Sequence, residues 1–99
     1  MTKEEIKEAI LKNKDLLRRY KVRSIALFGS YARGEQTEDS DVDLLVEFDS
    51  GVTLFDIVDL QDDLSELLGK RVHVVSKRGL SRHIGPSILK EAEAIGERL

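Results

Sequence analysis

Two aspartates open an apolar run, with a single valine between them. In the segment Asp41-Val42-Asp43, an extended backbone would place both carboxylates on one face, about 6.6 Å apart along the chain. Carboxylates about 5 Å apart repel by roughly 3 kcal/mol at an effective dielectric near 20. A solvated strand edge would relieve this repulsion, and so would a hard divalent cation. Because Mg²⁺ takes one or two carboxylates together with substrate phosphate oxygens, the pair is a candidate site for Mg²⁺ or Mn²⁺.

A second candidate group lies just before the aspartates, where another apolar run ends at Gly29-Ser30. Glycine lets the backbone approach a ligand closely, while a serine hydroxyl and the N–H groups of a following turn can hold phosphate oxygens. Arg33 falls within that turn and would add charge-assisted hydrogen bonds. Each of these residues alone is also typical of an ordinary turn or surface ion pair. Their place beside the aspartates favours a binding site for a phosphorylated ligand.

Two familiar motifs with similar letters are excluded. Gly29 and Gly34 have the glycine spacing of a P-loop, but Glu35-Gln36 follow where that loop requires lysine and then serine or threonine. Asp39, Asp41 and Asp43 imitate the first three ligands of a calcium-binding EF-hand loop. Leu44 then replaces the turn glycine of that loop and Ser50 its final glutamate, so the EF-hand interpretation fails as well.

Length and composition limit what kind of protein carries these residues. The 99 residues are 40% hydrophobic and 35% charged with a single proline, which predicts one folded domain over residues 1–99. The net charge of −3 lacks the positive field of a duplex-binding protein, so direct nucleic-acid binding is not expected. No stretch reaches the roughly 18 apolar residues of a membrane span, and a cytoplasmic location is expected by default. Cysteine is absent, which excludes disulfides and thiolate metal sites.

The elements that must position the candidate residues alternate between helices and strands. A capping-box pattern at Thr2 and Glu5 predicts an amphipathic helix that ends at about residue 19. Runs rich in aliphatic and β-branched residues predict buried strands over residues 22–28 and 42–48. A single helical turn is expected between them at residues 30–34. The two candidate groups would therefore lie at the end of one strand and the start of the next.

The second half of the chain predicts a helix, a strand and a closing helix. Thr53 with Asp56 is typical of a helix N-terminus, and the apolar stripe that follows ends at Gly69. Residues 71–76 are expected to form a short third strand. Pro86 suits the first turn of a final helix. Its apolar positions would be Ile88, Leu89, Ala92 and Ile95. This alternation predicts one sheet covered by helices, in an α/β or α+β arrangement.

Gly29-Ser30, ten residues and then Asp41-Val42-Asp43 resemble the signature of the DNA polymerase beta-like nucleotidyltransferase superfamily. The segment GSYARGEQTEDSDVDLLV looks like its minimal nucleotidyltransferase (MNT) branch, and the order of elements extends the resemblance over nearly the whole chain. It implies an α+β domain with α/β-like order, in which a small mixed β-sheet is flanked by helices. It also implies an Mg²⁺-dependent nucleotidyltransferase. Asp41 and Asp43 would hold the metal, while Gly29 and Ser30, with Arg33, would hold the phosphates of a nucleoside triphosphate.

The resemblance also indicates an acceptor and a partner. A single domain lacks the additional domains with which larger relatives hold a nucleic acid or a small acceptor, so a partner protein would supply the acceptor group. Members of the MNT branch commonly act as antitoxins encoded beside a HEPN-domain ribonuclease toxin, and some transfer AMP to a toxin tyrosine. The expected substrate is therefore ATP, and the expected partner is a HEPN toxin.

The chain departs from the family pattern at His73, where a third carboxylate is usual. Imidazole suits Zn²⁺ or Mn²⁺ better than Mg²⁺, so His73 is either a metal ligand of another kind or a partly exposed strand residue. Glu47 shares the face of the aspartates but lies about 13 Å along the strand from Asp43, too far to replace the missing ligand. His83 is expected to be structural or solvated. Two other functions stay open: a module that neutralises its partner by binding alone, and a nucleotide sensor.

Overall fold

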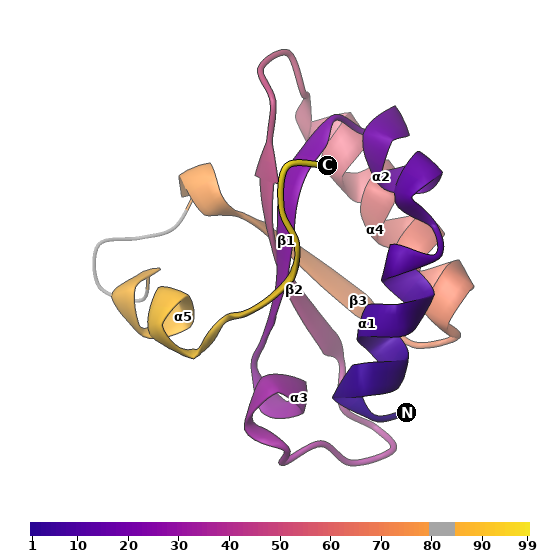
Figure 1. Ribbon diagram of the computed structural model, residues 1–99, viewed down its shortest axis with the longest axis vertical. Coiled ribbons are helices and arrows are strands. Elements are labelled where there is room, and N and C mark those ends of the chain that lie inside the picture. Colours follow the sequence, from indigo (N-terminus) through magenta and orange to yellow (C-terminus); the bar gives the residue numbers. More distant parts are fainter. Residues whose placement is uncertain (80–84) are drawn as a thin grey trace.

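The centre of the molecule is a four-stranded sheet (Figure 1). The computed structural model describes residues 1–79 and 85–99. The strands lie in the order β3-β2-β1-β4. Their bounds are Val22–Phe28 for β1, Val42–Phe48 for β2, Val72–Ser76 for β3 and Glu93–Gly96 for β4. The strand β2, which carries Asp43, is therefore an interior strand with a partner on each side.

The sheet is mixed, as the resemblance implies. β1 is antiparallel to both β2 and β4, while β2 and β3 are parallel. A parallel pair needs a crossover connection, and the helix α4 (Leu54–Leu68) supplies it between β2 and β3. The prediction of a small mixed sheet flanked by helices is confirmed.

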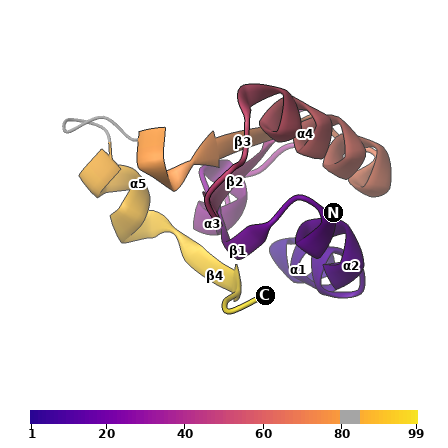
Figure 2. The same ribbon diagram turned by 90° about the horizontal axis from the view of Figure 1, so that it is seen from above.

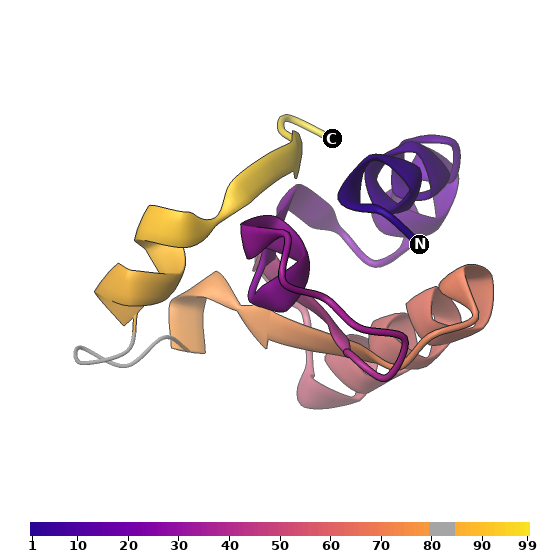
Figure 3. The ribbon, with the colours of Figure 1, turned by 90° about the horizontal axis from the view of Figure 1, so that it is seen from below.

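Three helices cover one face of the sheet and a fourth lies on the other side. Figure 2 shows α1 (Lys3–Leu11), α2 (Lys14–Arg19) and α4 together, with α5 (Gly85–Glu91) across the sheet from them. The short helix α3 (Ser30–Arg33) lies at the end of the sheet, where Figure 3 shows it between β1 and the loop that leads to β2. A 3₁₀ turn, Lys77–Gly79, follows β3. No helix in the described parts of the chain is long and apolar enough to cross a membrane.

The core lies between the three-helix layer and the sheet. Alternate residues of β2 point into it, because successive side chains of a strand face opposite sides. Its fully buried side chains include Ile6, Ile10, Leu17, Ile25, Leu27, Val42, Leu44, Val46, Leu60 and Leu64. Asp43 therefore belongs to the opposite face of the sheet.

Most of the predicted elements are confirmed. β1 and β2 have the predicted bounds, and β3 begins one residue later than expected. The capping box predicted at Thr2 with Glu5 is present, and the helix N-terminus predicted at Thr53 with Asp56 is confirmed and is also a capping box. The α4 helix ends at Gly69 in the left-handed conformation, with φ of 65°. The expectation for His83 falls outside the described residues.

The first helix is interrupted, contrary to the prediction of one helix to residue 19. The interruption is at Asn13, whose φ of −120° and ψ of 41° are not helical. Its side-chain Nδ2 donates a 2.7 Å hydrogen bond to the carbonyl oxygen of Ala9. An asparagine side chain that takes a helix carbonyl competes with the backbone hydrogen-bond ladder. The chain therefore ends α1 at Leu11 and begins α2 at Lys14, with two residues between the helices.

The prediction of a final helix that includes Ile95 is wrong. The helix α5 ends at Glu91, and residues 93–96 form β4 against β1. Leu27 pairs with Glu93 in this ladder, and Ile95 is a buried residue of β4. Without β4, the outer edge of β1 would leave backbone N–H and C=O groups unpaired. Pairing with that edge outweighs the helical spacing of the apolar residues.

An ion-pair cluster ties β4 to α1 and gives a first prediction. Glu93 accepts hydrogen bonds from Lys3 Nζ at 2.9 Å and Lys7 Nζ at 3.0 Å. These bonds, first from Lys3 and then from Lys7, lower the pKa of Glu93 below 4.5. The stabilisation is therefore present above about pH 4.5 and is lost as the pH falls through the lowered pKa. We expect Glu93→Gln to lower the Tm by about 2–5 °C at pH 7.

Thermal melts across this pH range test the cluster, with Glu97→Gln as the matched control. Glu97 is exposed and makes none of the ion pairs found among residues 1–79 and 85–99. A Glu93→Gln effect that equals the control, or that persists unchanged at pH 3.5, would contradict the assignment.

Candidate functional site

The candidate residues meet in one pocket at an end of the sheet. β1 ends there, and β2 and β3 begin there. The pocket has a volume of about 430 Å³. Its lining consists of Gly29, Ser30, Arg33, Ser40, Asp41, Asp43, His73 and Val75. Every residue that the sequence predicted for the site lines this pocket.

The glycine of the turn lies directly against an aspartate. In the β1–β2 ladder Phe28 pairs with Asp43, so Gly29 begins the turn beside that carboxylate. Gly29 has φ of 77° and ψ of −154°, a conformation essentially restricted to glycine. A Cβ atom at this position would also collide with Asp43 Oδ2. Only glycine meets both requirements.

The aspartates and the histidine come from adjacent strands. Asp41 lies just before β2, and Asp43 pairs with His73 across the parallel β2–β3 ladder. His73 Nε2 is 3.0 Å from Asp41 Oδ2, while half of the His73 side chain is exposed. The imidazole therefore contacts one of the two carboxylates and borders the other.

The surroundings of Asp43 disfavour its negative charge. Burial is the main cause that raises the pKa of Asp43 above 3.8, and the charges of Asp41 and Glu91 add to it. His73 and Arg33 act in the opposite direction without cancelling the shift. A bound cation would offset the cost of ionising this half-buried carboxyl group.

The arginine of the turn is held by two carboxylates. Arg33 Nε donates to Glu35 Oε2 at 3.1 Å, and Arg33 Nη1 donates to Glu91 Oε2 at 3.0 Å. These bonds, with Glu35 as the largest contributor, raise the pKa of Arg33 further above its usual value. Glu91 also accepts a hydrogen bond from the backbone N–H of Gly29 at 3.0 Å.

Glu91 is the neighbour of the site that sequence reasoning missed. It lies 62 residues beyond Gly29, in a segment whose apolar spacing suggested only a helix. No local motif marks it. The signal that would have found it is the pairing of β4 with β1, since that ladder leads directly toward Gly29.

The donor set fits a hard divalent cation with few protein ligands. In the described residues, no three His, Asp or Glu side chains are grouped so as to hold a metal ion. Of the residues in 1–79 and 85–99 that line the pocket, Asp41 and Asp43 are the two carboxylates. Two carboxylates match Mg²⁺, which fills its remaining positions with waters and substrate phosphate oxygens.

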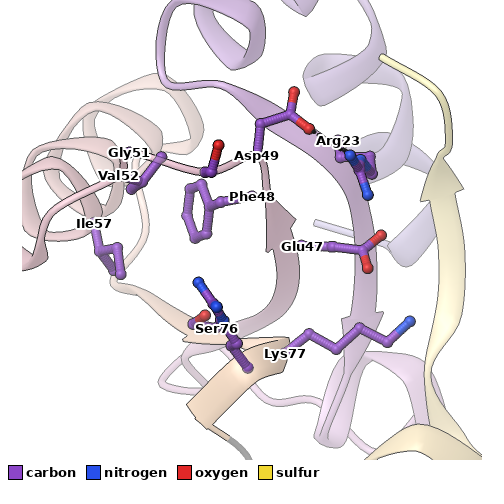
Figure 4. A pocket seen from close by; sticks show the side chains of 11 residues that line it. Arg23, Glu47, Phe48, Asp49, Gly51, Val52, Ile57, Ser76 and Lys77 are labelled. Carbon is purple, nitrogen blue, oxygen red and sulfur yellow. Dashed lines mark hydrogen bonds and ion pairs between the residues drawn. The ribbon is translucent and has the colours of Figure 1, made fainter.

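A larger pocket lies at the opposite end of β2, where Figure 4 shows it. Its volume is about 660 Å³. Phe48 and Ile57 contribute apolar side chains, and Arg23 pairs with Asp49 at 2.8 Å on its rim. Glu47 lines this pocket and not the smaller one, as its distance from Asp43 along the strand predicts. Because the larger pocket lacks the paired aspartates and the glycine-serine turn, we place the candidate chemistry in the smaller one.

Comparisons with known proteins give matches over almost the whole chain. The model of the family described as "Nucleotidyltransferase domain" matches residues 6–95. Protein adenylyltransferase MntA of Thermococcus cleftensis is 45% identical over 92 residues, which are 92% of this chain and 93% of that protein.

Solved structures agree with the sequence match. A candidate minimal nucleotidyltransferase superimposes with a TM-score of 0.78 at 44% identity, over 94% of this chain and 95% of that one. A toxin–antitoxin crystal structure with AMP-PNP also gives a TM-score of 0.78, at 27% identity, over 92% of this chain and 73% of that one. The similarity therefore covers both the sequence and the arrangement of the elements.

Proposed function

This chain belongs to the nucleotidyltransferase domain family, and from that premise we propose that it transfers AMP from ATP to a partner protein. Its mixed sheet flanked by helices matches the polymerase beta-like nucleotidyltransferase fold. One observation carries the proposal: Gly29, Ser30 and Arg33 of the turn line the same pocket as the paired Asp41 and Asp43. That juxtaposition suits a triphosphate and its metal ion.

The turn would bind the phosphates of ATP, and the aspartates would bind the metal ion. Ser30 and the free N–H donors of Arg33 would hold phosphate oxygens. Asp41 and Asp43 would hold Mg²⁺, which when bound neutralises the charge of the triphosphate. His73 would fix the orientation of Asp41 through their 3.0 Å contact. If His73 instead bound the metal directly, Mn²⁺ would be favoured over Mg²⁺.

AMP transfer requires mainly that the protein position the reacting groups, and little covalent chemistry by its side chains. A hydroxyl oxygen of the acceptor forms a bond to the α-phosphorus of ATP. The bond from that phosphorus to the oxygen that bridges to the β-phosphorus breaks, so that pyrophosphate leaves in line. The hydroxyl proton passes to solvent. The protein residues hold the triphosphate while this exchange occurs.

A partner protein is the acceptor that best fits this chain. The 45% identical relative is named a protein adenylyltransferase, and the 27% identical toxin–antitoxin structure contains the ATP analogue AMP-PNP. With the MNT resemblance, these findings support a HEPN-domain toxin as acceptor and this chain as its antitoxin. A cytoplasmic location is part of the proposal. The net charge of −3 argues against nucleic acid as the bound partner.

Intact-mass spectrometry of the HEPN-domain protein encoded beside this chain tests the proposal. After incubation with the chain, ATP and Mg²⁺, we expect its mass to rise by one or more AMP units. The rise should be absent with Asp41→Asn, because one of the two metal ligands is lost. Circular dichroism and size-exclusion chromatography of the variant with its partner check that folding and assembly persist.

A second candidate function follows from His73, which stands where the family usually has a carboxylate. A stable complex that gains no AMP with the native chain would contradict the transferase proposal and indicate neutralisation by binding alone. Partner affinity that changes with AMP-PNP and Mg²⁺, without transfer, would indicate a nucleotide sensor instead.

A further inference from the structure

Glu91 is brought to the candidate site by the strand that follows it. β4 pairs antiparallel with β1 and places Glu93 opposite Leu27. If this register is continued by two residues beyond the ladder, Glu91 comes opposite Gly29. The topology therefore carries a carboxylate from the C-terminal part of the chain to the turn after β1.

The Glu91 carboxylate bridges the two ends of that turn. Its Oε1 accepts from the Gly29 N–H, and its Oε2 pairs with Arg33 Nη1, both at 3.0 Å. Arg33 is held a second time by Glu35. A guanidinium has five N–H donors, and the contacts found among residues 1–79 and 85–99 use two of them, which leaves three for another ligand. The Glu91 side chain thus holds both the backbone of Gly29 and the side chain of Arg33, and Arg33 keeps N–H donors for a ligand.

Glu91 contacts the turn but does not line the pocket. Gly29 and Arg33 line the pocket, whereas Glu91 is not among its lining residues. The pocket side of Gly29 faces Asp43, with which any Cβ at residue 29 would collide. Gly29 therefore lies against Asp43, which lines the pocket, and is hydrogen-bonded to Glu91, which does not. A carboxylate in that place orients the donors of the turn without taking the position of a phosphate.

We propose that Glu91 is a positioning residue for triphosphate binding, acting through Gly29 and Arg33. This inference rests on the proposed function, since it assigns that turn to the phosphates of ATP. A donor that is fixed before the ligand arrives loses less conformational freedom on binding. Glu91 would therefore contribute to nucleotide affinity without touching the nucleotide.

Calorimetric titration of the full chain with AMP-PNP and Mg²⁺ tests this role. We expect Glu91→Ala to weaken binding by about tenfold, the scale of a lost charge-assisted hydrogen bond. Glu91→Gln keeps an oxygen acceptor for the Gly29 N–H and should weaken binding by about threefold. The matched control is Glu93→Ala, which breaks two ion pairs in the same segment and should leave AMP-PNP affinity unchanged.

A double-mutant cycle with Arg33→Ala separates positioning from a general loss of stability. If Glu91 acts through Arg33, removing Glu91 from the Arg33→Ala chain should cost clearly less affinity than removing it from the native chain. Fully additive losses would overturn the inference. So would unchanged affinity in Glu91→Ala, or tighter binding, which would mean that Glu91 competes with phosphate. If Glu91→Ala does not fold, the Glu91→Gln titration decides.

The native chain distinguishes failure of this inference from failure of the proposed function. A native chain that binds AMP-PNP but transfers no AMP to its partner contradicts the proposed function, and the Glu91 variants still decide the positioning role. A native chain that binds no AMP-PNP overturns both.

Discussion

Replacement of Asp43 with asparagine is expected to slow AMP transfer by on the order of 10³-fold, because the site loses a carboxylate where the charge of the triphosphate must be neutralised. The measurement is the initial rate of AMP addition to the partner at saturating ATP. Asp39→Asn is the matched control, since Asp39 is exposed, lies in the same acidic segment and does not line the pocket. A comparable loss in both variants would assign the effect to overall charge and contradict a specific role for Asp43.

The same substitution is expected to stabilise the metal-free protein at neutral pH. Burial raises the pKa of Asp43 in the folded chain, so the folded state binds this proton more tightly than the unfolded state does. The protonated form contributes stability that is lost as the pH rises through the raised pKa of Asp43. At pH 7 the ionised carboxylate therefore lowers the stability of the folded chain. Asp43→Asn should therefore melt at a higher temperature than the native chain at pH 7 without divalent cations.

Melting curves recorded with a chelator between pH 3.5 and 7 check the direction of this difference in Tm. The advantage of Asp43→Asn should shrink as the pH falls toward the ordinary value of 3.8, where the native group also becomes protonated. A lower Tm of Asp43→Asn at pH 7 would mean that Asp43 stabilises the folded chain. A loss of AMP transfer in this variant could then not be attributed to the site alone.

Gly29→Ala is expected to damage stability and activity together. The new methyl group would need a glycine-restricted conformation, which costs about 1–3 kcal/mol, and would also collide with the Asp43 carboxylate. A loss of this size lowers the Tm of a domain of about 100 residues by roughly 5–20 °C. Because relief of the collision displaces Asp43, transfer should fall by at least about 10²-fold at temperatures where the variant stays folded.

Gly34→Ala provides the control at the other end of the same turn. Gly34 also has a positive φ, of 72°, but a Cβ there meets no atom within 4 Å. The Gly34→Ala chain should lose stability through backbone strain but keep most of its rate of AMP transfer. Equal loss of transfer in both variants would contradict the role of the contact between Gly29 and Asp43.

The parts of the site that the sequence could predict are the local ones. Gly29-Ser30 directly follows one strand and Asp41-Val42-Asp43 opens the next, so periodicity and turn chemistry placed both correctly. The structure brings them together because β1 and β2 are neighbours. That the bound molecule would be ATP came from the family resemblance and not from periodicity or spacing.

The parts that could not be predicted depend on long-range pairing. The spacing of Ile88, Ala92 and Ile95 fits a helix, and only the open edge of β1 decides that residues 93–96 form a strand. The same error concealed Glu91, whose place follows from that strand. At Asn13 the failure has a local cause, since one side-chain hydrogen bond to Ala9 ends a helix whose apolar pattern continues.

The hydrogen bond between Gly29 and Glu91 joins residues that are 62 positions apart. This separation determines how late during synthesis of the protein the bond can form. A chain grows from its N-terminus, so both aspartates leave the ribosome long before Glu91 does. The turn can acquire this support only after residue 91 has been synthesised. A nascent or truncated chain that ends before residue 91 would carry both aspartates and the Gly29 turn without the hydrogen bonds from that turn to Glu91. Full nucleotide affinity would then belong only to chains whose synthesis has passed that point.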